Sequence, residues 1–93
     1  YKLTVHHYLD GTTESVPLKD STTGEKVADE ITEDLKKNSE YTTTQAGETK
    51  IDYSIYELVS IPENATGTIQ EDIEVTYYYK IKTADIKKIM KKH

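Results

Sequence analysis

Adjacent His6 and His7 are the first side chains in the chain with the chemistry of a metal site. They lie within residues 1–9, where apolar Leu3 and Val5 alternate with polar residues, a pattern typical of a half-buried β-strand. Neighbouring side chains on a strand point to opposite faces, so the two imidazoles cannot readily bind one ion. We therefore predict no metal site, with His7 at the margin of the core and His6 on the wet face.

No other pattern in the sequence points to catalysis or to a cofactor. The acids of residues 25–37 are spread round one expected helix, whereas glycoside hydrolysis needs two carboxylates that face each other across a cleft. Residues 20–25 begin like a calcium loop, but the twelfth position, which needs an acid, is Ile31. The chain has no glycine-rich phosphate loop and no supported Ser-His-Asp arrangement. The sequence therefore predicts neither an enzyme nor a resident cofactor.

The eight tyrosines are the more promising chemical feature. A tyrosine ring can stack on the C–H face of a sugar ring, and its hydroxyl can bond sugar hydroxyls. Alternation through residues 73–82 places Tyr77 and Tyr79 on one face and Tyr78 on the other. If the first and last strands are neighbours, one wet, partly aromatic face carries His6, Tyr8, Thr76, Tyr78 and Lys80. We predict a surface for a glycan or a neighbouring repeat there; the alternative is that tyrosine only covers a half-exposed sheet.

Composition narrows the class of protein. The chain has 93 residues, 34% hydrophobic and 31% charged, which fits one small domain with a thin core. Cys is absent, so disulfides and thiolate metal sites are excluded. All 12 Lys and Arg residues are Lys and the net charge is −5, which argues against nucleic-acid binding. Fourteen Thr suit a β-rich protein that works outside a cell.

The sequence contains neither a transmembrane helix pattern nor a signal-peptide pattern. No apolar stretch approaches the roughly 20 residues that a transmembrane helix needs, so we expect no membrane insertion. No signal-peptide pattern opens the chain, and we expect the sequence to be part of a longer protein.

Four strands and one helix are expected to position these side chains. Asp10-Gly11 predicts a tight turn that returns an antiparallel strand over residues 12–18. Within residues 25–37, Val27, Ile31 and Leu35 recur every four residues, which predicts an amphipathic helix. Residues 51–61 and 73–82 are predicted strands, and residues 40–50 are a loop or a short strand.

This order of elements predicts an α+β fold of the ubiquitin-like β-grasp type. It is a four-stranded mixed sheet (strand-strand-helix-strand-strand) with one helix packed on one face. The first and last strands would be central because they have the cleanest alternation, with the second and third at the edges. A right-handed crossover through the helix would place a later strand parallel to the first. We assign the domain to residues 1–82. Residues 83–93 would be a basic tail that contacts an anionic surface, or a linker.

Three segments in the second half resemble a known repeat, the mucin-binding-protein (MucBP) domain. Residues 56–60 (Tyr-Glu-Leu-Val-Ser) resemble its Tyr-x-Leu-Val strand, and residues 62–68 (Pro-Glu-Asn-Ala-Thr-Gly-Thr) its Asn-Ala-x-Gly-Thr turn. Residues 75–80 (Val-Thr-Tyr-Tyr-Tyr-Lys) resemble its closing Val-Thr-Tyr-x-Tyr-Lys strand. Residues 3–8 with Asp10-Gly11 are similar to the family's first strand and hairpin. The resemblance spans residues 2–82, and residues 24–55 depart most from the family pattern.

The resemblance implies an extracellular, cell-wall-anchored repeat of a Gram-positive bacterial surface adhesin with a β-grasp-like fold. The implied partners are glycans of host mucin or another glycoprotein, and neighbouring repeats of the same chain. We therefore expect a non-catalytic binding repeat. The alternatives are a structural spacer that projects another domain from the cell wall without binding a ligand, and an accessory domain of an enzyme.

Overall fold

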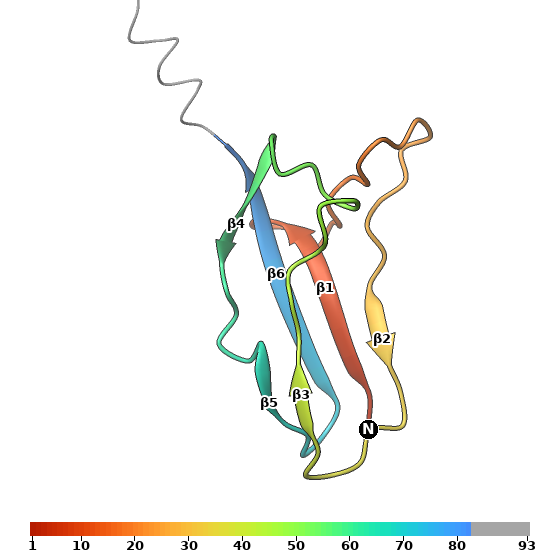
Figure 1. Ribbon diagram of the computed structural model, residues 1–93, viewed down its shortest axis with the longest axis vertical. Coiled ribbons are helices and arrows are strands. Elements are labelled where there is room, and N and C mark those ends of the chain that lie inside the picture. The colour runs from red at the N-terminus through yellow and green to blue at the C-terminus, as the bar shows by residue number, and fades with distance from the viewer. Residues whose placement is uncertain (83–93) are drawn as a thin grey trace, which may run out of the picture.

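The computed structural model describes residues 1–82, and the predicted basic tail at residues 83–93 lies outside them. Within the described residues the protein has six strands and no helix (Figure 1). The strands are β1 (Leu3–Leu9), β2 (Glu30–Thr32), β3 (Glu40–Thr42), β4 (Tyr56–Ser60), β5 (Thr66–Thr68) and β6 (Ile73–Ile81). They form a four-stranded sheet in the order β2-β1-β6-β4 and a two-stranded sheet of β3 and β5. No helix of this part of the chain could cross a membrane.

The centre of the larger sheet is a parallel pair made by the first and last strands. Leu3 of β1 is opposite Ile73 of β6, and the register continues unbroken to Leu9 opposite Tyr79. β2 adds antiparallel to the free edge of β1, and β4 adds antiparallel to the free edge of β6. The predicted central placement of these two strands is therefore confirmed, and β6 is the later strand that runs parallel to β1. Their clean alternation gives each strand one apolar face, which the rest of the chain covers.

The predicted α+β β-grasp fold is wrong, because residues 25–37 form no helix. This segment runs extended and contributes β2 to the sheet edge, where Ile31 is opposite Thr4. Val27 is buried as predicted, but Ile31 is 57% exposed, so no common stripe faces the core. A spacing of four residues also keeps side chains on one face of a strand, and the pattern alone therefore did not require a helix.

The predicted return strand over residues 12–18 is also largely wrong. The turn itself forms at Asp10-Gly11, where Gly11 has a φ of 76°, a left-handed value that glycine adopts without strain. Beyond it the chain pairs only through two isolated bridges, Tyr8 with Ser15 and Pro17 with Lys26. Proline has no N–H for a ladder, which limits this segment to isolated bridges.

The predicted strand over residues 51–61 is shorter than expected. Only Tyr56–Ser60 forms β4, and its register with β6 shifts between Leu58 and Ser60. Such a bulge explains why the apolar residues of this segment fall on both parities of the alternation. The intervening Val59 is 41% exposed.

The core lies between one face of the four-stranded sheet, here called the inner face, and the two segments that carry β3 and β5 (Figure 1). Tyr77 and Tyr79 are the largest fully buried side chains, and His7 is buried beside them. The hydroxyl of Tyr77 is 2.8 Å from the hydroxyl of Thr43, and Ala46 N–H donates to the hydroxyl of Tyr79. The rings of these tyrosines thus fill the core, and their hydroxyls hold the covering segment (residues 39–53) to the sheet.

Candidate functional site

The residues predicted to form a ligand surface lie on the opposite, outer face of the central strand pair. In the parallel register His6 is opposite Thr76, and Tyr8 is opposite Tyr78. Neighbouring strands are about 4.8 Å apart, so each pair of partners lies side by side. Lys80 follows Tyr78 by two positions and shares its face. The structure brings these side chains together on one surface, and their part in binding remains a prediction.

The inner and outer faces differ sharply in burial. On β6, Tyr77 and Tyr79 have 2% and 0% exposure, whereas Tyr78 between them is 38% exposed. The side chain of Lys80 is 52% exposed and its Nζ lies 3.6 Å from a carboxylate oxygen of Glu57 on β4. The outer face is therefore accessible to a ligand around Tyr78.

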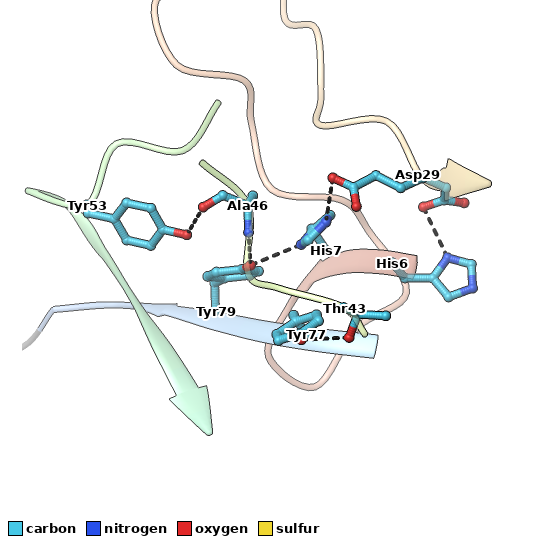
Figure 2. A network of polar contacts seen from close by, with 9 residues as sticks. His6, His7, Asp29, Thr43, Ala46, Tyr53, Tyr77 and Tyr79 are labelled. Atoms are coloured by element: carbon cyan, nitrogen blue, oxygen red, sulfur yellow. Dashed lines mark hydrogen bonds and ion pairs between the residues drawn. The ribbon is translucent and has the colours of Figure 1, made fainter. Parts of the chain in front are cut away.

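His6 is the best-anchored residue of the outer face. Its Nε2 is 2.9 Å from Glu74 Oε1, and its Nδ1 is 3.0 Å from Asp29 Oδ1 (Figure 2 shows the latter pair). Only the protonated imidazolium can donate from both nitrogens. Partial burial alone would lower the pKa of His6, but the hydrogen bonds to Glu74 and Asp29 outweigh burial and raise it.

Tyr8 is positioned by the same histidine. Its ring stacks on His6, with a centroid separation of 4.8 Å and an interplanar angle of 24°. The Tyr8 hydroxyl oxygen is also 3.0 Å from His6 Nδ1. The orientation of Tyr8 therefore depends on the ion cluster of His6, Asp29 and Glu74.

His7 lies on the inner face, in a buried polar network (Figure 2). The Tyr79 hydroxyl accepts from Ala46 N–H at 3.0 Å and lies 2.9 Å from His7 Nδ1. The hydroxyl of Tyr79 thus links the imidazole of His7 to the backbone of Ala46. Nε2 is 3.6 Å from Glu30 Oε1, too far for a hydrogen bond, and has no hydrogen-bond partner among residues 1–82. Burial lowers the pKa of His7, and its ring packs beside those of Tyr77 and Tyr79.

The outer face is hollowed at the end where β1 turns back. Residues 11–14 and the ring of Tyr78 line an open depression of about 780 Å³. The Thr12 hydroxyl donates to the carbonyl of Leu9 at 2.8 Å and accepts the N–H of Glu14 at 3.0 Å, which fixes the shape of the loop. A depression with one exposed aromatic wall and one polar rim can hold a small polar ligand.

Comparison with known proteins assigns the chain to a family. Residues 3–80 match the family model described as the MucBP domain. This chain belongs to the MucBP family. A search of curated proteins and a search of solved structures each found no match. MucBP is a family of binding domains rather than of enzymes, and its members occur in surface proteins of Gram-positive bacteria.

Two residues that shape the outer face of this MucBP domain, Asp29 and Glu74, were not among the predicted site residues. Glu74 shares the parity of Thr76 on β6, so the alternation pattern contained the signal that would have found it. Asp29 could not be found in this way, because the segment before β2 was assigned to a helix. The predicted placement of His6 and His7 on opposite faces is confirmed.

Proposed function

We propose that this MucBP domain is a non-catalytic binding repeat of a cell-wall-anchored bacterial adhesin that contacts glycans of host mucin or another glycoprotein. The observation that carries the proposal is the pair of neighbouring tyrosines on the outer face. Tyr78 is 38% exposed on the wall of the depression, and Tyr8 lies opposite it in the register. Exposed rings of this kind offer a stacking surface for sugar rings.

The fixed orientation of Tyr8 also supports glycan binding at this surface. Tyr8 is held by stacking on His6, so binding would cost little additional side-chain entropy. The hydroxyl of Thr76 and the ammonium of Lys80 lie on the same face and supply polar groups for sugar hydroxyls. One small surface makes few contacts, so useful affinity would come from several neighbouring repeats that act together.

Tyr78→Ala is expected to weaken mucin binding about tenfold, which corresponds to the loss of one stacked ring. The measurement is surface plasmon resonance of the protein over immobilised mucin. Because the ring is partly exposed and makes no hydrogen bond within the described residues, the variant should fold normally. Tyr1→Ala is the matched control, since Tyr1 is 49% exposed and lies outside the proposed surface. Equal binding by Tyr78→Ala and wild type would refute this surface.

A spacer that binds no ligand is the second candidate, and the parallel pairing of β1 and β6 favours it. Because β1 and β6 are parallel, the described chain begins at one end of the sheet and β6 finishes at the other (Figure 1). This path suits a repeat in a linear string. A spacer that binds nothing predicts no mucin binding by the wild-type protein in the same assay, so wild-type binding would exclude it.

A further inference from the structure

Charge around the two outer tyrosines is predominantly negative. Asp29 and Glu74 flank His6 at 3.0 and 2.9 Å, so the cluster next to Tyr8 carries a net charge of about −1 with His6 protonated and about −2 with it neutral. On the other side, Glu14 stands at the rim of the depression beside Tyr78 and makes no ion pair with a described residue.

The lysine within the proposed surface, Lys80, is paired with an acid of its own. Lys80 shares the face of Tyr78, but its Nζ lies 3.6 Å from the carboxylate of Glu57, so the pair is neutral overall. The pKa of the Tyr8 hydroxyl is raised, first by burial and then by the negative charges of Asp29 and Glu74. A ligand on this surface therefore meets the acids Asp29 and Glu74 beside Tyr8, and Glu14 beside Tyr78.

We propose that the outer face selects uncharged glycan ends, such as hexose or N-acetylhexosamine, and disfavours chains that end in sialic acid or sulfate. This selectivity rests on the proposed function, because it concerns the ligand of the same tyrosine surface. Uncharged sugars lose nothing in a negative potential and retain the stacking and hydroxyl contacts. A sugar that carries a carboxylate or sulfate also has a ring face to stack, but Asp29, Glu74 and Glu14 repel its charge.

The expected discrimination follows from Coulomb's law. Two uncompensated acids about 8 Å from a bound carboxylate weaken its binding by about fivefold in a water-like dielectric at low salt. At physiological ionic strength the Debye length is about 8 Å, and screening reduces the preference to about twofold. Selectivity based on shape would not change with salt, so the salt dependence identifies charge as the cause.

The test compares one neutral mucin-type oligosaccharide with its sialylated form, titrated into the full chain and followed by NMR. We expect the neutral glycan to bind about fivefold more tightly at about 10 mM salt, with the preference lost at about 500 mM. Equal or tighter binding of the sialylated form at low salt overturns the selectivity but leaves the proposed function in place. If neither glycan binds at millimolar concentration, the proposed function itself fails, and the selectivity with it.

The variant Glu14→Gln tests whether the acid beside Tyr78 causes the repulsion of the sialylated glycan. The variant should bind the sialylated glycan about twofold more tightly at low salt, with the affinity for the neutral glycan unchanged. Glu40→Gln is the matched control, because Glu40 is an exposed acid on β3, away from the outer face. An unchanged preference in Glu14→Gln would contradict the placement of the glycan end beside Tyr78.

Discussion

Tyr79→Phe is expected to lower the free energy of unfolding by about 2–4 kcal/mol, although it removes a single oxygen atom. Tyr79 has 0% exposure, and its hydroxyl joins His7 Nδ1 at 2.9 Å to the N–H of Ala46 at 3.0 Å. Phe fills the same volume but leaves both buried groups without a partner. For a domain whose total stability is about 5–15 kcal/mol, this loss is large.

The measurement is urea unfolding followed by circular dichroism. Tyr78→Phe is the control, since the neighbouring hydroxyl is on the outer face and its removal should change stability by less than about 0.5 kcal/mol. If Tyr79→Phe is as stable as wild type, the polar network of the inner face does not hold the segment of Ala46 to the sheet.

Thermal stability is expected to reach a maximum near pH 6.5, the ordinary pKa of histidine, because the folded-state pKa values of His6 and His7 shift in opposite directions. Burial lowers the pKa of His7, and the charge of Lys50 lowers it further. The charges of Glu30 and Asp29 raise it but do not outweigh burial. The contribution of His7 is therefore complete above pH 6.5 and is lost as the pH falls toward its lowered value. The pKa of His6 is raised, so its contribution is complete below pH 6.5 and is lost as the pH rises.

Differential scanning calorimetry between about pH 5 and about pH 8 tests this. Between the unfolded and folded pKa values, each histidine changes the stability by at most about 1.4 kcal/mol per pH unit. His6→Gln should flatten the alkaline side of the profile and leave the acidic side, which belongs to His7. A melting temperature that rises or falls steadily across the whole range in the wild type would show that the two environments are assigned wrongly.

The sequence predicted the strands that carry the proposed surface, because their alternation admits one interpretation. β1 and β6 each have an unbroken period of two, and their register follows once they are neighbours. The shared face of His6, Tyr8, Thr76, Tyr78 and Lys80 could therefore be derived without coordinates. The family resemblance was likewise confirmed over residues 3–80.

The wrong predictions concern segments whose conformation depends on contacts with distant strands. Residues 25–37 have apolar positions four apart, a spacing that fits a strand as well as a helix, and the segment gains its extended form by pairing with β1. The covering segment near residues 39–53 has weak patterning, because Tyr41, Ala46 and Ile51 are buried one by one rather than along a face. Hydroxyls of distant tyrosines on β6 hold it, and no local pattern records such contacts.

The central claim is that the outer face of β1 and β6 is the glycan surface. Amide chemical-shift mapping of the labelled protein during titration with mucin O-glycans tests it most directly. We predict that the shifted amides cluster at His6, Tyr8, Thr76 and Tyr78 and in the loop of residues 11–14. Shifts confined to β3 and β5, or none at millimolar glycan, would contradict it.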